Sequence, residues 1–242
     1  MKKSSSSKRI VVGVTGSIAA YKACELVRLL VKKGHEVHVV MTANAMEFVT
    51  PLTFKTLSRN SVRTGLFSEP DRWEPGHISL ADLADIVVVA PCTANVIAKI
   101  AVGIADDLLT STCLATSATL MIAPAMNTGM WENPFVQENI SKLQAKGYHI
   151  LNPESGFLAC GTNGTGRMVE VEDIYEKTVE ILSQKKNLAG KKILITAGGT
   201  REKIDPVSKK PIIGQDGKAE KESVLTKKGL QISLPCQDFG RN

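Results

Sequence analysis

Short runs rich in β-branched residues alternate with longer helical stretches along most of this 242-residue chain. Strands that alternate with helices in this way form a parallel sheet with helices on both faces. The runs that predict strands are 9–14, 36–41, 85–90, 119–123, 148–151 and 191–196, with a weaker one near 62–67. The stretches that predict helices are 18–33, 51–58, 94–100, 106–115, 134–146 and 171–183. The sequence therefore predicts an α/β fold, with a doubly wound parallel sheet in a single main domain.

The basic character of the chain is confined to its two ends. The formal net charge is +6 at pH 7. Residues 1–9 supply four positive charges and residues 208–242 a net three, which leaves the remaining body with a net charge of −1. A nucleic-acid-binding domain concentrates basic residues on one face of its folded body. We therefore expect no nucleic-acid partner.

Membrane and secretory signals are absent from the pattern of residues. No apolar run approaches the roughly 20 residues that a membrane helix needs, so no membrane partner is expected. The charged amino terminus is not followed by the apolar core of a secretory signal. The cysteines are scattered without metal-ligand spacing, which fits a reducing cytoplasm and predicts no metal site. They are Cys24, Cys92, Cys113, Cys160 and Cys236.

The first predicted strand ends in the segment GVTGSIAA, residues 13–20, which leads directly into a predicted helix. The N–H groups and the positive dipole end of a helix start suit a phosphate. Gly16 would let the backbone approach such a ligand closely, and Ser17 could add a hydroxyl donor. A simple tight turn between strand and helix explains the same residues, and both interpretations stay open.

Small polar side chains also follow two other predicted strands. Thr42 and Asn44 come after the second strand, and Thr93 and Asn95 follow the strand at 85–90. Ligands bind to open α/β sheets at the carboxyl ends of the strands, so these side chains could line a cleft. Thr93 and Asn44 could equally cap the next helices, and one residue can serve both purposes.

Two further segments carry specific patterns. Residues 152–170, NPESGFLACGTNGTGRMVE, are rich in glycine and show no periodicity, which predicts a structureless insertion of functional importance. The fifth strand ends in PAMNTGMW, residues 124–131. The pattern Pro-x-Met-Asn-x-x-Met-Trp follows a Pro-x-x-Ala-Asn stretch at 91–95 and the segment GSIAAYK at 16–22. In this order the three patterns resemble the flavin-containing cysteine decarboxylases, and most of all the bacterial bifunctional phosphopantothenoylcysteine decarboxylase/phosphopantothenate–cysteine ligase family.

The resemblance extends from about residue 8 to residue 207 and implies a fold, a cofactor and a reaction. The fold is flavodoxin-like, of the Rossmann type. The reaction is FMN-dependent decarboxylation of 4′-phosphopantothenoylcysteine to 4′-phosphopantetheine in coenzyme A biosynthesis. Flavin oxidises the thiol-bearing carbon to a thioaldehyde, carbon dioxide leaves, and the enethiol is reduced again. By the same resemblance the chain is expected to form a homo-trimer or a dodecamer.

The resemblance also assigns roles to individual residues. His77 would act in the oxidative half, Asn127 would bind the substrate carboxylate, and Cys160 would donate the final proton. The implied FMN-binding residues are Gly16, Ser17, Ile18, Thr42, Thr93, Ala94 and Asn95. The implied substrate-binding residues are Met126, Asn127, Ala159, Gly161 and Arg167, the last three in a clamp over the substrate.

The carboxyl-terminal part departs from the bifunctional family. Residues 1–186 would form the decarboxylase domain, and residues 187–207 a linker and the first strand of a ligase domain. Residues 208–242 diverge and read as a disordered tail, so ligase activity is expected to be absent, with Mg and CTP needed only by a complete ligase domain. Two alternatives stay open: a peptidyl-cysteine decarboxylase, and a non-enzymatic FMN-binding regulatory protein. A flavin prenyltransferase fits the motifs less well.

Overall fold

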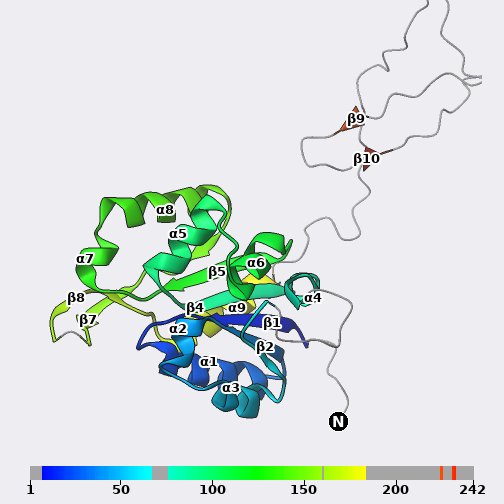
Figure 1. Ribbon diagram of the computed structural model, residues 1–242, viewed down its shortest axis with the longest axis horizontal. Helices are drawn as coiled ribbons and strands as arrows, with labels where there is room; N and C mark the ends of the chain where they lie inside the picture. Colours follow the sequence, from blue (N-terminus) through cyan, green and yellow to red (C-terminus); the bar gives the residue numbers. More distant parts are fainter. Residues whose placement is uncertain (1–6, 67–75, 160, 184–223, 226–230, 233–242) are drawn as a thin grey trace, which may run out of the picture. The chain divides into compact units, whose positions relative to one another are not determined.

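The computed structural model describes residues 7–66, 76–159, 161–183, 224–225 and 231–232 (Figure 1). The chain divides into two units, Met1–Asn187 and Leu188–Asn242. In the second unit, the described residues are an antiparallel pair, β9 (Val224–Leu225) and β10 (Gln231–Ile232). The strand expected at 191–196 and the rest of the expected tail lie outside the described residues. The domain boundaries inferred from the sequence stay predictions.

The first unit is built on a six-stranded parallel sheet. Its strands are β1 (Arg9–Val14), β2 (Glu36–Met41), β3 (Val62–Arg63), β4 (Ile86–Cys92), β5 (Thr119–Pro124) and β6 (His149–Ile150). Their order in space is β3-β2-β1-β4-β5-β6. Strands β2 and β3 are added on one side of β1, and β4, β5 and β6 on the other, so the strand order reverses between β1 and β4. This is the strand order of the Rossmann type, and it confirms the predicted doubly wound sheet. Ligands bind to such sheets at the crevice outside this switch point.

Helices cover both faces of the sheet because alternate strand residues point to opposite sides. Ile10, Val12 and Val14 of β1 pack in one core with α1 (Ala20–Lys32), α3 (Pro51–Ser58) and α9 (Val171–Ser183). Val11 lies in the other core. The helices on that side are α4 (Gly76–Leu83), α5 (Ala94–Val102), α6 (Leu108–Ala115) and α8 (Pro134–Ala145). Figure 1 shows α1 and α3 on one side of the sheet and α5, α6 and α8 on the other.

Two parts of the fold differ from the sequence-based expectation. Helix α4 was not predicted, because it begins at a glycine and shows only a weak amphipathic pattern. Residues 152–170 are not structureless: β7 (Glu154–Phe157) and β8 (Asn163–Arg167) form an antiparallel hairpin. The hairpin was missed because its sequence has no alternating apolar pattern. It is held by backbone pairing and by a 2.8 Å hydrogen bond between the Ser155 and Thr165 hydroxyls. Two short helices, α2 (Ala43–Met46) and α7 (Thr128–Trp131), follow β2 and β5.

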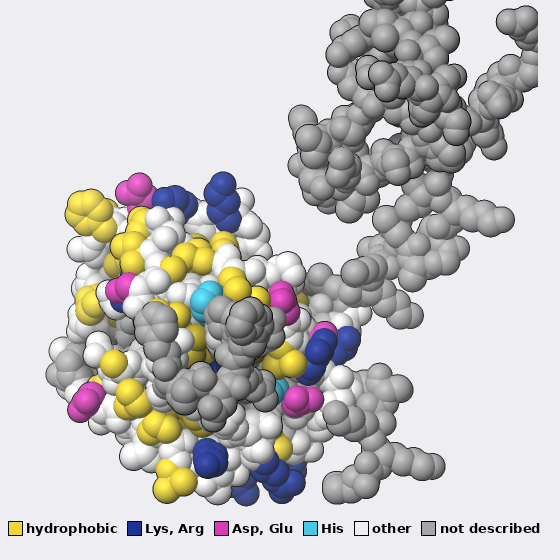
Figure 2. Space-filling view, turned by 45° about the vertical axis from the view of Figure 1, so that its right-hand side comes forward, with side chains coloured by type: hydrophobic (Ala, Val, Ile, Leu, Met, Phe, Trp, Pro, Cys, Tyr) yellow, Lys and Arg dark blue, Asp and Glu magenta, His cyan; other side chains and the backbone are white. Residues whose placement is uncertain are grey.

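Apolar side chains reach the surface at several places, as Figure 2 shows for one face. Ile18 and Tyr21 at the start of α1 are each 55% exposed, and Leu52 of α3 is 69% exposed. No helix among the described residues is long and apolar enough to cross a membrane.

Candidate functional site

Thr15 joins the carboxyl ends of β1 and β4 at the switch point. Its hydroxyl donates to the Pro91 carbonyl oxygen over 2.8 Å and accepts from the Thr93 N–H over 3.0 Å. The residue is fully buried. The turns after β1 and β4, which carry Gly16 and Thr93, are therefore held directly against each other. Thr15 was not among the expected site residues, although its place at a strand end, before Gly16, is a signal that could have identified it.

The helices that follow these two turns begin without side-chain caps. Ala19 and Thr93 occupy the N-cap positions of α1 and α5, and neither side chain caps its helix. The Ser17 hydroxyl accepts a 3.3 Å hydrogen bond from the Ala19 N–H inside the turn. Two helix starts that lack side-chain caps thus meet at the switch point with their positive dipole ends, which is an arrangement that favours an anionic group.

The segment after β2 packs against the same turn. A Cβ atom on Gly16 would lie 2.4 Å from the Asn44 Cβ, so only glycine allows this contact. Thr42, rather than Asn44, caps α2, because its hydroxyl accepts from the Ala45 N–H over 3.3 Å. Capping was expected of Asn44 and Thr93, but Thr42 caps α2, and the side chain of Thr93 makes no cap hydrogen bond.

The PAMNTGMW segment lies at the carboxyl end of the neighbouring strand β5. The Ala125 N–H donates to the Cys92 carbonyl over 3.0 Å, which joins this segment to the end of β4. Asn127 is exposed and caps α7, with its Oδ1 accepting from the Gly129 N–H over 2.8 Å. That bond orients the side-chain amide, whose NH2 group is the donor that a carboxylate would need. Met126 beside it is partly buried.

The β7–β8 hairpin rests on this same segment. The Met126 N–H donates to the Gly166 carbonyl over 2.9 Å. A Cβ on Gly166 would lie 2.1 Å from the Met126 oxygen, and one on Gly164 would lie 2.2 Å from the Thr128 hydroxyl oxygen. Gly166 thus lets the backbones of β8 and Met126 touch, and Gly164 leaves room for the Thr128 side chain. At the end of the hairpin, the Leu158 N–H donates to the Thr162 carbonyl over 2.8 Å.

Two of the expected clamp residues lie at the tip of the hairpin, between β7 and β8. Ala159 and Gly161 are exposed, and Gly161 has a positive φ of 84° that favours glycine. Cys160 between them lies outside the described residues. Its expected role as a proton donor therefore stays a prediction.

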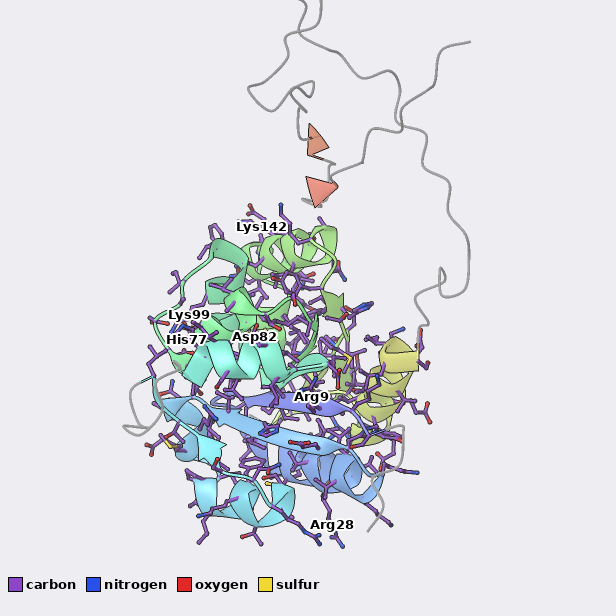
Figure 3. All side chains as sticks on the ribbon, turned by 90° about the vertical axis from the view of Figure 1, so that its right-hand side faces the viewer. Arg9, Arg28, His77, Asp82, Lys99 and Lys142 are labelled. Atoms are coloured by element: carbon purple, nitrogen blue, oxygen red, sulfur yellow. The ribbon has the colours of Figure 1, made fainter. Side chains whose placement is uncertain are left out.

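His77 is the second residue of α4, and His77 and Asp82 mark the two ends of this helix in Figure 3. The Nδ1 atom of His77 is buried and has no hydrogen-bond partner within the part of the chain that the structure describes. Leu108 of α6 lies 3.9 Å from the position of a Cβ on Gly76, and the next residue, Leu109, contacts Gly13 of β1. Two adjacent residues of α6 therefore link the start of α4 to the end of β1. A buried ring nitrogen that lacks a partner among the described residues is expected where a bound ligand supplies the hydrogen bond.

The two described cysteines near the site are not reactive thiols. Burial, and secondarily the nearby Cys113, raises the pKa of Cys92 well above its ordinary value. Burial also raises the pKa of Cys113 to about 12. Both side chains stay protonated at neutral pH and act as small core residues. In the described ranges, His, Cys, Asp and Glu form no group of three or more that could hold a metal ion.

The comparisons with known proteins agree with this geometry. A model of the Flavoprotein family matches residues 1–183. The chain belongs to the Flavoprotein family. Membership agrees with the resemblance on which the expected site rests, and the match covers residues 1–183 of the unit Met1–Asn187, which carries the switch point.

The curated relatives are about twice as long as the region they share with this chain. The coenzyme A biosynthesis bifunctional protein CoaBC of Haemophilus influenzae is 49% identical over 200 residues, and that of Bacillus subtilis is 48% identical over 203 residues. Both matches cover 83% of this chain and 50% of the relative, so the chain spans about half the length of these relatives. The CoaBC protein of Mycolicibacterium smegmatis is 43% identical, with 95% of this chain and 56% of the relative covered.

Solved structures match over nearly their whole length. A PPC decarboxylase mutant complexed with pantothenoylaminoethenethiol is 32% identical, with a TM-score of 0.65, 72% of this chain covered and 97% of the other. The FMN-dependent cysteine decarboxylase SpaF is 30% identical, with a TM-score of 0.65, 73% of this chain covered and 97% of the other. The FMN-binding protein AtHal3 is 33% identical, with a TM-score of 0.63 and coverages of 74% and 98%. These neighbours confirm the flavodoxin-like fold.

Proposed function

We propose that this chain is a cytoplasmic enzyme that decarboxylates 4′-phosphopantothenoylcysteine to 4′-phosphopantetheine with bound FMN. One observation carries the proposal: Thr15 joins two uncapped helix starts at the switch point, beside the segment that holds Asn127. The names of the relatives and of the PPC decarboxylase neighbour support this substrate over others. Because the chain spans half of the relatives, the proposal concerns the reaction of the shared half.

The residues at the switch point fit FMN. The FMN phosphate would lie at the starts of α1 and α5, whose N-cap side chains make no cap hydrogen bond. Gly16, Ser17 and Ile18 would contact it from the first turn, and Thr42 from the segment beside that turn. Thr93, Ala94 and Asn95 would contribute from the start of α5. FMN, when bound, supplies oxidation of the thiol-bearing carbon of the substrate and its later reduction.

The protein's own groups would bind the substrate and move protons. Asn127 would donate its side-chain NH2 to the substrate carboxylate, and Met126 would pack against the substrate. The Nδ1 of His77, which has no partner among the described residues, would hold or move a proton in the oxidative half. Ala159 and Gly161, at the hairpin tip, would cover the substrate and exclude water, while Cys160 would supply the final proton.

The ligase reaction of the bifunctional relatives is a separate question. The match to the Mycolicibacterium smegmatis protein covers 95% of this chain, so it includes most of the segment after Val207. That segment still lacks an Asn-x-Ser-Ser-Gly nucleotide-binding stretch. We propose that this chain decarboxylates without ligating, and that Mg and CTP are cofactors only of a complete ligase domain.

We also propose a homo-oligomer, either a trimer or a dodecamer built as a tetramer of trimers. Exposed apolar side chains occur on the segments after β1 and β2: Ile18 and Tyr21 at the start of α1, Phe48 just after α2, and Leu52 in α3. The contact of Gly16 with Asn44 brings these two segments together. A second copy of the chain would remove this apolar surface from water. Light scattering of the purified chain measures the number of copies.

The experiment is a substrate comparison with the purified chain loaded with FMN. Phosphopantothenoylcysteine should yield phosphopantetheine and carbon dioxide, whereas a peptide with a carboxyl-terminal cysteine should react slowly or not at all. Faster reaction of the peptide would establish the peptidyl-cysteine alternative. Retention of FMN without either reaction would establish the regulatory alternative. Ligation of phosphopantothenate to cysteine in the presence of CTP would overturn the proposed loss of that activity.

A further inference from the structure

The carboxylate of Glu170 connects the β7–β8 hairpin to helix α1. Its Oε2 accepts a 2.9 Å hydrogen bond from the Nζ of Lys22, which lies in the first turn of α1. Its Oε1 accepts from the Nη2 of Arg167, the last residue of β8. One side chain thus contacts, through its two oxygens, two elements that are far apart in the sequence.

Lys22 gives this connection its strength. Its side chain is only 10% exposed, and Glu170 is the carboxylate that pairs with it among the described residues. A buried ammonium group is costly unless it is paired, so Lys22 fixes the position of Glu170 more firmly than a surface ion pair would. The lowered pKa of Glu170, caused first by the hydrogen bond from Lys22, agrees with a carboxylate that stays charged.

Arg167 extends the connection to both strands of the hairpin. It belongs to β8, and its side chain crosses to β7, where its Cδ and Nη1 each lie 3.6 Å from the position of a Cβ on Gly156. Just before it, Gly166 makes the backbone contact with Met126. The orientation of Arg167 therefore bears on how the hairpin sits over the segment that holds Asn127.

We infer that Glu170 is a positioning residue, which binds Lys22 and Arg167 together and thereby sets the β7–β8 hairpin over the candidate site. Lys22 lies a few residues after Gly16 and Ser17 in the same turn-and-helix segment. The three side chains therefore link the proposed phosphate-binding turn to the proposed substrate cover. The effect on catalysis rests on the proposed function, whereas the effect on the hairpin does not.

The sequence-based prediction gave Arg167 a different role, as a residue that binds substrate directly. The two roles differ in a measurable way. A residue that only binds substrate changes KM when it is replaced and leaves the free protein unchanged. A residue that positions the hairpin changes the protection of hairpin amides in the free protein, and lowers kcat because the site is less well assembled.

The test compares Glu170→Gln and Arg167→Gln with a matched control. Glu180→Gln makes the same chemical change within α9, the helix that begins just after Glu170, at a carboxylate that pairs with Lys177 on the surface. Hydrogen exchange of the segment 154–167 is measured in the full chain without substrate. Both test variants should raise exchange of this segment by roughly tenfold, with the β1 and β4 amides unchanged, and the control should not. The kcat for decarboxylation should fall with little change in KM.

A second variant covers the risk that an unpaired Lys22 prevents folding. Lys22→Met combined with Glu170→Gln removes both charges and should fold, yet should show the same rise in hairpin exchange. Unchanged exchange of segment 154–167 in all these variants would overturn the inference. If the exchange rises but the native chain neither binds FMN nor releases carbon dioxide, the proposed function fails and the positioning role stands. A raised KM for Arg167→Gln with unchanged exchange would instead establish direct substrate binding.

Discussion

His77 carries a buried Nδ1 atom for which the described residues provide no hydrogen-bond partner. His77→Gln should leave FMN binding intact and lower kcat by roughly 100-fold or more, the usual contribution of a positioned acid or base. Flavin absorbance and product formation measure the two effects separately. His35→Gln is the matched control, because His35 also has a buried Nδ1 without a partner, but in the turn between α1 and β2. Equal losses in the two variants would show that the effect is structural.

Gly166 is a position at which the backbone conformation and a close contact require glycine. It has a φ of 154°, and a Cβ would meet the Met126 oxygen at 2.1 Å. Gly166→Ala should therefore separate β8 from Met126, at a local cost of roughly 1–3 kcal/mol, and lower kcat. Gly147→Ala isolates the strain of a positive φ, because Gly147 has a φ of 89° and open space around it. It should lower the unfolding free energy by about 1 kcal/mol and leave kcat unchanged. If Gly166→Ala lowers kcat no more than Gly147→Ala does, the contact between Gly166 and Met126 is not important for catalysis.

Sequence patterns identified the polar residues at the strand ends, but not the contacts among them. Gly16, Thr42 and Thr93 stood out because residue type and place along the chain are visible in one sequence. Thr15 and Lys22 did not, because their partners, Pro91 and Glu170, are far away in the chain. Pairing over such separations follows from sheet order and helix packing, which residue patterns alone do not specify.

At the scale of elements, strands and long helices were predicted well because their apolar periodicity is strong. β1 and β2 were predicted with the bounds that the structure shows, whereas β3 was predicted longer than its two residues. The expected start of the first helix at residue 18 was two residues early, because the turn after β1 continues to Ala19. α4 and the hairpin were missed because neither has an apolar pattern that distinguishes it from a loop.

The junction between β1 and β4 is the element-scale feature that most directly supports the site. Thr15→Val should leave the Pro91 carbonyl with a weaker 3.3 Å bond and the Thr93 N–H without a partner, at a cost of roughly 1–3 kcal/mol. FMN should also bind more weakly. Urea unfolding and FMN titration measure these effects. Thr178→Val is the control, because Thr178 is equally buried but its hydroxyl bonds the Ile174 carbonyl within α9. Similar losses of FMN affinity in both would argue against a special role for the junction.

The contacts of Glu170 with Lys22 and Arg167 predict that the stability of the fold depends on pH. The pKa of Glu170 is lowered from 4.5, first by the hydrogen bond from Lys22 and then by the charges of Lys22 and Arg167. A folded-state pKa below the unfolded value stabilises the fold above that value, and the effect is lost as the pH falls through the folded pKa. Lys22 and Arg167 face Glu170 from α1 and β8, and Glu172 and Asp173 lie beside it on α9.

Urea unfolding of the native chain and Glu170→Gln measures this dependence. The native chain should be the more stable at pH 7, and the difference should shrink below about pH 4.5 as Glu170 becomes protonated. Glu180→Gln provides the reference for loss of a surface carboxylate. A difference that is constant with pH would mean that the charge of Glu170 does not stabilise the fold.

At the scale of the whole molecule, the part of the chain that matches the Flavoprotein family, residues 1–183, contains the sheet and the hairpin that form the candidate site. Its sheet brings the turns after β1 and β4 together, and its hairpin covers the segment after β5. The bifunctional relatives extend well beyond the shared region, so activity of this unit is a property to be measured on this chain itself.

The most direct measurement follows the carboxyl carbon of the substrate. Purified chain is stripped of flavin, and phosphopantothenoylcysteine labelled in its carboxylate is added before and after FMN is restored. The account predicts no labelled carbon dioxide from the stripped protein and rapid release once FMN is bound. Release that does not depend on FMN, or a folded, FMN-loaded chain that releases none, would contradict it.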